Sequence, residues 1–372
     1  MDSESRIRRR LLRIAALIAS LPGAALSTLT SAPAVAATAS RVRPGAAGWP
    51  TEAQWQELAR AVGEAFIKPQ SPLVACIASR SEADCKRLFE AVKNPYFMSD
   101  DPALTQTLGW VGAWTSMPSA YAIAARHTSD VVAAVNFARE HRLRLVVKGG
   151  GHSYQGTSNA SDSLLVWTRR MNEITVHDAF VADGCDKAAA PVRAVSVGAG
   201  ALWGEAYDAV TTRAGGYVQG GGCLSVGVAG LIQSGGFGSF SKAFGLAAGS
   251  LLQAEVVTAD GVVRIANACT HPDLFWALKG GGGGALGIVT RLVLRVHALP
   301  ETFGAVNLKV QATSPAAYRR LIGVMVDFYA RHLLNPHWGE QMRLRPNNVL
   351  QVSMVFQGLS RSQAVAIWQP FF

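Results

Sequence analysis

The hydrophobic positions of this chain change several times between helical and strand-like spacing. Residues 53–66 and the stretch after Ser129 carry apolar side chains on one helical face, and we expect the Ser129 hydroxyl to cap the second helix. Short apolar runs at 143–147, 164–168 and 194–197 predict strands. Residues 251–258 and 262–266, joined by Asp260-Gly261, predict a hairpin. Helices and strands mixed in this way indicate an α+β fold.

The pattern changes character after about residue 304. Before that point, residues 201–214 and 273–279 look helical and residues 288–296 form a long alternating strand pattern. After it come a strand pattern at 306–310, a helical pattern at 316–333, a strand pattern at 350–356 and a further helix start at 360–368. One or two strands do not make a stable sheet, so we expect either a very small second domain or a chain cut short at Phe372.

Glycine is concentrated in the middle of the chain. Of the 37 glycines, 27 lie between residues 149 and 287. Glycine at this density indicates a backbone that approaches a ligand closely, or many tight turns. We therefore expect the functional site in this stretch.

Two glycine motifs differ in what they predict. The pattern G-x-G-x-x-G at 282–287 has a helix before it and a strand after it, the reverse of a dinucleotide-binding βαβ unit, so we reject that function there. Lys148-Gly149-Gly150-Gly151-His152-Ser153-Tyr154 instead follows the strand 143–147 directly. Its unhindered N–H groups can cradle a pyrophosphate, with His152 beside the cofactor. The alternative is a glycine-rich turn with an incidental histidine.

A second glycine cluster surrounds Cys223. It runs from Gly220 to Gly230 and continues at Gly235-Gly236-Phe237-Gly238. Cys223 has three possible roles: it contacts the ligand of this loop, it is a small buried hydrophobic residue, or it is one half of a disulfide. We expect no metal, because the chain has no C-x-x-C or H-E-x-x-H motif and its eight histidines are dispersed.

Charge and the N-terminus indicate export. The net charge is +10, of which residues 1–36 contribute +3; the rest is scattered, so we expect no nucleic-acid partner. Arginines before a broken apolar stretch and an Ala-x-Ala site predict a signal peptide at 1–37, and Arg9-Arg10-Leu11-Leu12-Arg13 is similar to a twin-arginine signal. The alternative is an amphipathic or disordered terminus. The stretch is too short and interrupted for a stable membrane anchor, so we expect a secreted or periplasmic protein.

Five cysteines in an exported chain leave at least one outside any internal disulfide. If Cys76, Cys85, Cys185 and Cys269 pair, Cys223 remains. The sequence does not give the connectivity, and four reduced thiols remain the alternative.

Four motifs together resemble one family. They are Gly150-Gly151-His152-Ser153-Tyr154, Gly222-Cys223-x-x-Val226-Gly227, Gly235-Gly236-Phe237-Gly238, and Asp273–Gly280 with the glycine run after it. In order and spacing they are similar to the berberine bridge enzyme-like FAD-linked oxidoreductases, within the p-cresol methylhydroxylase (PCMH) and vanillyl-alcohol oxidase superfamily. The resemblance covers roughly residues 121–300.

The resemblance implies an α+β architecture with a PCMH-type FAD-binding domain of two subdomains at 116–300. The start of an antiparallel-sheet substrate domain would follow at 304–372, and a linker and helical segment would precede at 38–115. The family's catalytic residues lie downstream of the position of Phe372, so we expect residues 1–372 alone to lack substrate turnover.

The resemblance also assigns residues to the cofactor. It implies bicovalent FAD, with His152 bonded to the flavin 8α-methyl group and Cys223 to C6, and Val226 as a small gate on the oxygen side. The cofactor-binding residues that we expect are Gly149, Gly150, Gly151, His152, Ser153, Tyr154, Cys223, Val226, Gly227, Gly230, Gly235, Gly236, Gly238, Gly287, Ile288 and Val289.

The expected function is an oxidase. A small-molecule alcohol or sugar would give hydride to FAD, and O₂ would take the electrons to give H₂O₂. The alternatives are a flavin-binding chain without catalysis and a flavin dehydrogenase that uses another electron acceptor.

Overall fold

The computed structural model of this chain describes residues 41–79, 81–107, 109–110, 112–185 and 190–372. The predicted signal peptide lies outside the described residues. Val42–Phe372 form one unit that contains sheets of four, five and three strands and, in its described part, two two-stranded ribbons. The mixed α+β architecture predicted from the sequence is confirmed.

The first sheet follows the order β1-β4-β6-β5. Its strands are β1 (Phe66–Ile67), β4 (Tyr121–Ala124), β5 (Arg144–Lys148) and β6 (Ser163–Trp167). β4 and β5 both pair in parallel with β6, and α6 (Thr128–Glu140) makes the crossover from β4 to β5. Parallel pairs need such a crossover, and a helix usually supplies it.

The helix α6 begins two residues earlier than the sequence predicted, at Thr128 with His127 as its N-cap. Ser129 lies inside the first turn and is not the cap. The Asp130 carboxylate instead reaches back and accepts hydrogen bonds from the backbone N–H groups of Arg126 (2.9 Å) and His127 (3.1 Å). A carboxylate at the third helical position satisfies N–H groups that the helix itself leaves unpaired.

The N-terminal segment packs onto the first sheet. In α2 (Glu52–Val62), Trp55 is buried and stacks on Tyr121, with ring centroids 4.0 Å apart. A short 3₁₀ turn, Gly63–Ala65, leads into β1. The chain then forms α3 (Pro72–Ser79), α4 (Glu82–Ala91), α5 (Pro95–Ser99), β2 (Gly109–Trp110) and β3 (Trp114–Thr115). The last three of these elements, α5, β2 and β3, are too short to produce a periodic pattern in the sequence.

The second sheet is antiparallel, in the order β11-β10-β12-β8-β7. Its strands are β7 (Ile174–Phe180), β8 (Val192–Gly198), β10 (Leu251–Val257), β11 (Val263–Asn267) and β12 (Ile288–Arg295). β10 and β11 form the predicted hairpin, whose last pair is Val257 with Val263. β7 was not predicted, because it contains no apolar run: Thr175 and Asp178 are exposed, and the polar His177 is half-buried.

Helical segments pack against the core of the second sheet. They are α7 (Trp203–Tyr207), a π-helical segment (Asp208–Arg213) and α8 (Val228–Gln233), and they bury Trp203, Val228 and Ile232 completely. Smaller elements follow: β9 (Gly216–Tyr217) paired with β13 (His297–Ala298), α9 (Ser241–Phe244), a 3₁₀ turn (Ala247–Ser250) and α10 (Pro272–Leu278). The helix α6 also contacts this sheet, because Thr128 donates to Glu255 of β10 at 2.7 Å.

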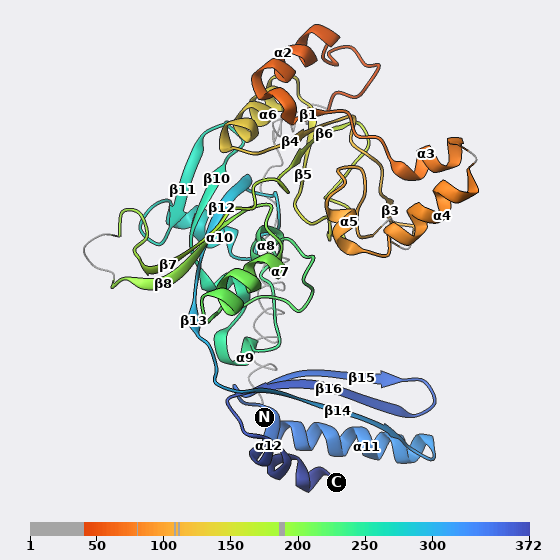
Figure 1. The fold of residues 1–372 in the computed structure, drawn as a ribbon, viewed down its shortest axis with the longest axis vertical. Coiled ribbons are helices and arrows are strands. Elements are labelled where there is room, and N and C mark those ends of the chain that lie inside the picture. Colours follow the sequence, from red (N-terminus) through yellow and green to blue (C-terminus); the bar gives the residue numbers. More distant parts are fainter. Residues whose placement is uncertain (1–40, 80, 108, 111, 186–189) are drawn as a thin grey trace, which may run out of the picture. The chain divides into compact units, whose positions relative to one another are not determined.

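The third sheet has the order β14-β16-β15, all antiparallel. Its strands are β14 (Phe303–Gln311), β15 (Trp338–Arg345) and β16 (Val349–Gln357). Figure 1 shows α11 (Pro315–Phe328) and α12 (Arg361–Trp368) on one side of it; a π-helical segment, Tyr329–Leu333, extends α11, and a 3₁₀ turn, Gln369–Phe371, follows α12. Trp338, Leu350, Val352 and Met354 are buried against these helices. The sequence pattern showed two of these three strands and missed β15, whose Gln341, Arg343 and Arg345 are exposed.

Candidate functional site

Four glycine-rich loops meet in one place. We call them the first loop (149–154, after β5), the second loop (219–227, before α8), the third loop (234–238, after α8) and the fourth loop (280–287, between α10 and β12). The four motifs of the predicted site, with the exception of the α10 helix itself, lie in these loops. They are far apart in the sequence, and the fold brings them together through contacts described next.

The first and second loops touch backbone to backbone. A Cβ atom added to Gly150 would lie 2.7 Å from the Ser225 carbonyl oxygen and 2.8 Å from the Gly227 nitrogen. Glycine is therefore required at position 150, because any side chain would force these two loops apart. The second loop in turn touches the third, since a Cβ atom on Gly238 would overlap the carbonyl oxygen of Gly220.

The fourth loop completes a ring of contacts. Gly282 N–H donates to the carbonyl of Gln233, at the end of α8, at 2.8 Å. On the other side, a Cβ atom on Gly284 would lie 3.8 Å from Val147 Cγ2, in the strand that leads to the first loop. The loops therefore contact one another in the order first, second, third and fourth, and the fourth loop contacts β5, which leads to the first loop.

The first loop presents hydrogen-bond donors. Its carbonyls are engaged: Gly150 O accepts from Ser99 Oγ at 3.1 Å, and Gly151 O accepts from Gln106 N–H at 3.0 Å. Within the described residues, the N–H groups of positions 150–153 have no acceptor. Gly151 has φ +77°, the conformation that turns successive N–H groups to one side. A row of free N–H donors fits a pyrophosphate, so the residues present suit the cofactor that the sequence predicts.

The Lys148 side chain, directly before the first loop, is anchored to residues 98–104. Its side chain is completely buried, and Nζ donates to the carbonyls of Met98 (3.1 Å), Leu104 (2.6 Å) and Asp101. Burial lowers the pKa of Lys148 to about 7, although Asp101 and Asp100 oppose the shift. In the sequence, Lys148 is recognisable only as the start of a motif, and its role in holding residues 98–104 follows from the tertiary structure alone.

The two predicted attachment residues face a common partner. His152 Nε2 lies 3.1 Å from Ser225 Oγ, and Cys223 Sγ lies 3.7 Å from the same oxygen. Cys223 is exposed, His152 is half-buried and Ser225 is buried. Burial lowers the pKa of His152, although a hydrogen bond with the backbone of Ser225 opposes the shift, and the lowered pKa favours the neutral imidazole. Sequence reasoning missed Ser225, which stands at an unspecified position of the motif around Cys223.

The cysteines pair in a way that singles out Cys223. Disulfides join Cys76 to Cys85 and Cys185 to Cys269, and Cys223 is free. Of the two alternatives left by the sequence, the structure selects the paired one.

The second loop rests on buried aromatic residues. A Cβ atom on Gly220 would enter the ring of Trp203, and Tyr207 donates to the Gly221 carbonyl at 2.6 Å. Burial raises the pKa of Tyr207 well above its usual range, and Tyr217 adds to this, so the phenol stays protonated as a donor. These contacts fix the position of the second loop, which carries Cys223.

The other predicted cofactor residues take different positions. Ser153 Oγ lies 2.8 Å from Thr157 Oγ1, and Tyr154 is exposed. Val226 is half-buried against the core of the second sheet, Gly227 lies against Gly150, and Gly230 is exposed on α8.

The remaining predicted residues belong to the third and fourth loops and to the start of β12. Gly235 and Gly236 have positive φ angles in the third loop, and Gly238 lies in that loop; Gly287 also has a positive φ angle, at the end of the fourth loop. The side chains of Ile288 and Val289 are buried in two different hydrophobic cores, so only their backbone is available at the site.

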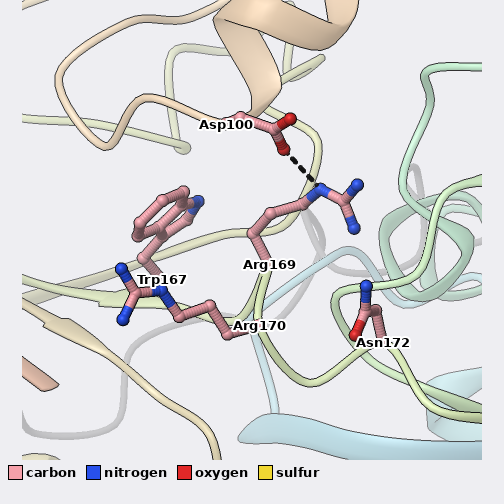
Figure 2. A pocket seen from close by; sticks show the side chains of 5 residues that line it. All are labelled: Asp100, Trp167, Arg169, Arg170 and Asn172. Atoms are coloured by element: carbon pink, nitrogen blue, oxygen red, sulfur yellow. Dashed lines mark hydrogen bonds and ion pairs between the residues drawn. The ribbon is translucent and has the colours of Figure 1, made fainter.

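A pocket of about 390 Å³ lies beside the end of β6 and is separate from this site. Asp100, Trp167, Arg169, Arg170 and Asn172 line it, and none of these is a predicted cofactor residue (Figure 2). Arg169 Nε donates to Asp100 at 2.8 Å, and Arg169 Nη2 donates to Glu205 at 2.7 Å. Burial alone would lower the pKa of Arg169, but Glu205 and Asp100 raise it. The guanidinium is thus held by carboxylates of this chain.

Among the described residues, no group of three or more His, Cys, Asp or Glu side chains is placed to hold a metal ion. Among the helices of the same residues, none has the length and apolar character to cross a membrane.

Residues 118–267 match the protein family described as "FAD binding domain". Over 355 residues the chain is 32% identical to the FAD-linked oxidoreductase easE of Trichophyton verrucosum, covering 88% of this chain and 58% of that protein. Over 293 residues it is 35% identical to the FAD-linked oxidoreductase malF of Malbranchea aurantiaca, covering 73% of this chain and 49% of that protein. The chain therefore spans roughly half the length of these relatives.

Solved structures of flavoproteins also resemble this chain. The VAO-type flavoprotein MtVAO615 from Myceliophthora thermophila superimposes with a TM-score of 0.77 at 26% identity, over 89% of this chain and 62% of that one. A variant of berberine bridge enzyme gives a TM-score of 0.65 at 19% identity, over 86% of this chain and 58% of that one, which is a likeness of fold. The resemblance predicted from the four motifs is confirmed.

Proposed function

We propose that this chain, which belongs to the FAD-binding proteins of the vanillyl-alcohol oxidase and berberine bridge enzyme-like family, is the flavin-binding part of an FAD-dependent oxidase. The match to an FAD binding domain and the FAD-linked oxidoreductase relatives support FAD as cofactor. Because the chain spans 58% of the first of these relatives, oxidation of a substrate by the whole protein is part of the proposal.

The observation that carries the proposal is the meeting of the four loops. It places the free N–H groups of the first loop, the His152 imidazole and the exposed Cys223 thiol around one location. When bound, FAD supplies the hydride-accepting chemistry, and the protein supplies orientation and electrostatics. Here the first loop would bind the pyrophosphate, and the second loop would hold the flavin ring by one edge.

We propose two covalent bonds to the flavin, from His152 to the 8α-methyl carbon and from Cys223 to C6. Each bond replaces one hydrogen of the flavin and one hydrogen of the side chain. The two hydrogens leave with two electrons on O₂, as one H₂O₂ for each bond formed. A neutral imidazole is the nucleophilic form of histidine, and the lowered pKa of His152 favours that form.

The attachment is tested by acid precipitation of the purified chain and mass spectrometry of its peptides. We expect the flavin to stay with the protein, joined to the peptides that contain His152 and Cys223. His152→Ala and Cys223→Ala should each retain flavin through the other residue, and the double variant should release it. The control is His177→Ala, because His177 lies in β7 and bonds Ser196, outside the four loops. A yellow supernatant from the unmodified protein would contradict the proposal of covalent attachment.

We propose O₂ as the electron acceptor, on the basis of the small side chain at Val226. In the family a valine three residues after the flavin cysteine accompanies oxidase activity, and isoleucine accompanies dehydrogenase activity. Among solved proteins of this fold, wild-type Phl p 4.0202 is described as a glucose dehydrogenase, and an isoleucine-to-valine variant of Phl p 4 as a glucose oxidase. Val226→Ile should therefore slow the reoxidation of reduced flavin by air, measured by stopped-flow absorbance. An unchanged rate would favour the dehydrogenase alternative or a valine that only packs.

The substrate class that we propose is an alcohol or a sugar that gives hydride from a CH–OH carbon. H₂O₂ release on aerobic incubation of the whole protein with a panel of sugars and alcohols tests this proposal. Oxidation of none of them would contradict it.

We also propose export through the N-terminal signal. The arginine-rich segment before a short apolar stretch supports it. Fractionation of producing cells should find the protein outside the cytoplasm, and replacing Arg9 and Arg10 with Lys should retain it inside if the twin-arginine route is used.

A further inference from the structure

We propose that Ser225 is a positioning residue for both attachment residues of the flavin: its hydroxyl accepts the Nε2 hydrogen of His152 and donates its own hydrogen to Cys223 Sγ. The inference rests on the proposed covalent attachment and adds to it the residue that aligns the two nucleophiles. It comes from contacts between three side chains of two loops that lie about seventy residues apart in the sequence.

The geometry places one oxygen between two nucleophiles. Ser225 Oγ is 3.1 Å from His152 Nε2 and 3.7 Å from Cys223 Sγ, the latter within the range of a hydrogen bond to sulfur. The Ser225 side chain is 2% exposed, so water does not compete freely for its hydroxyl. A hydroxyl has one hydrogen to donate and can accept from another group, which suits it to join a donor and an acceptor.

The direction of these hydrogen bonds follows from which ring nitrogen must react. Nε2 of His152 lies within hydrogen-bond distance of Ser225 Oγ, and no side-chain partner of Nδ1 lies among the described residues. If Nε2 carries the hydrogen and donates it to Ser225, Nδ1 keeps its lone pair and is the nucleophile. The serine hydrogen then points to Cys223 Sγ, and this hydrogen bond holds the sulfur atom in a fixed direction.

The backbone holds Ser225 in this position independently of a cofactor. Its carbonyl oxygen lies where a Cβ atom of Gly150 would come within 2.7 Å, so the first loop is packed directly against it. Val226 N–H donates to the Cys223 carbonyl at 3.2 Å, which forms a tight turn around Ser225. The arrangement is therefore present before any bond to flavin forms.

The experiment compares Ser225→Ala with Ser225→Thr, which retains a hydroxyl. Each protein is prepared without flavin and mixed with FAD in air, and the attachment at His152 and at Cys223 is followed separately by mass spectrometry of peptides. Ser225→Ala should slow attachment at His152 by about tenfold, the effect of one hydrogen bond, and Ser225→Thr should restore most of the rate. The alkylation of Cys223 by iodoacetamide in the flavin-free protein should also slow several-fold in Ser225→Ala.

The matched control is Ser196→Ala. It removes the hydroxyl of another serine that contacts a histidine, His177 Nε2, at 2.8 Å in the second sheet. Because this pair lies outside the four loops, attachment should proceed at the wild-type rate. Equal attachment rates for wild type, Ser225→Ala and Ser196→Ala would overturn the proposal, and so would equal slowing in both variants.

A second measurement needs neither a variant nor bound flavin. Nitrogen NMR of the flavin-free wild-type protein reports which nitrogen of His152 carries the hydrogen. Hydrogen on Nε2 supports the role of Ser225, and hydrogen on Nδ1 overturns it. If the wild-type protein never attaches FAD, the proposed covalent attachment fails, and this measurement still decides whether Ser225 accepts the Nε2 hydrogen of His152.

Discussion

Lys148 is a charged residue in the interior, and its three hydrogen bonds explain how it is tolerated there. An ammonium group has three donors, and the carbonyls of Met98, Asp101 and Leu104 accept all of them. Burial of a charge costs free energy, which is the reason for the lowered pKa. The same bonds connect the strand before the first loop to α5 and to the segment that follows it.

Lys148→Met should destabilise the protein by about 3 kcal/mol or more, because it leaves three buried carbonyls without a donor. The loss should depend on pH. The pKa is about 7 in the folded state and 10.5 in the unfolded chain, so the unfolded state binds more protons between these values. The contribution of Lys148 is therefore full above about pH 10.5, falls as the pH falls towards about 7, and is constant below that. Urea unfolding of both proteins across this range checks the difference, and parallel pH profiles would contradict the assignment.

Gly150→Ala tests the contact between the first and second loops. The new Cβ atom would lie 2.7 Å and 2.8 Å from backbone atoms of Ser225 and Gly227, which cannot move aside as a flexible side chain can. We expect a loss of about 1–3 kcal/mol in the free energy of unfolding and weaker binding of FAD. The control is Gly249→Ala, whose Cβ atom meets nothing within 4 Å, and which should change stability by less than about 0.5 kcal/mol. Similar unfolding midpoints for the two variants would show that the loops separate easily.

At the scale of elements, the two disulfides differ in the length of chain that they close. Cys76–Cys85 joins α3 to α4 across 9 residues, and Cys185–Cys269 joins the segment after β7 to the turn after β11 across 84 residues. In the chain-entropy model these loops correspond to about 2.6 and about 4.5 kcal/mol of stabilisation. The Cys185–Cys269 disulfide should therefore contribute more to the free energy of unfolding than the Cys76–Cys85 disulfide.

Replacing both Cys185 and Cys269 with alanine should lower the free energy of unfolding by about 2 kcal/mol more than the same change at Cys76 and Cys85. The two double variants are matched controls, since each removes two sulfur atoms and one bond. Chemical denaturation under non-reducing conditions measures both. An equal loss, or a larger loss for the short connection, would show that local packing outweighs chain entropy here.

At the scale of the whole molecule, the proposed FAD would connect two sheets. The first loop follows a strand of the parallel sheet, and the fourth loop leads into β12 of the antiparallel sheet. The sheets already share a core, since Val257 and Ile288 of the second pack with Leu164 and Val166 of the first. A ligand held by both should stabilise them together.

FAD should raise the melting temperature of both sheets in one transition. The double variant His152→Ala, Cys223→Ala is suited to the measurement, because its binding would be reversible. At a free concentration of about 100 times Kd the stabilisation should be about 2.7 kcal/mol. Calorimetry checks this, and two transitions of which FAD moves only one would contradict a site made by both sheets.

The sequence by itself determined the α+β class, the β10–β11 hairpin and the strand before the first loop, because these depend on hydrophobic periodicity and on turn residues close together in the chain. Four glycine-rich motifs in fixed order also predicted the resemblance to the berberine bridge enzyme-like flavoproteins, which the comparisons bear out. The predicted attachment bonds, the oxygen gate and the export signal remain predictions.

Only the tertiary structure decided the rest. The N-cap of α6 is His127 and not Ser129, and the Asp130 carboxylate inside the first turn accepts from the free N–H groups. The edge strand β15 and the short helix α5 are stabilised by their neighbours and leave little periodicity of their own. The place of Ser225 between His152 and Cys223, and that of Lys148 beneath the loop, depend on contacts between segments that are tens of residues apart. Such contacts form by packing, and no local pattern in the sequence encodes them.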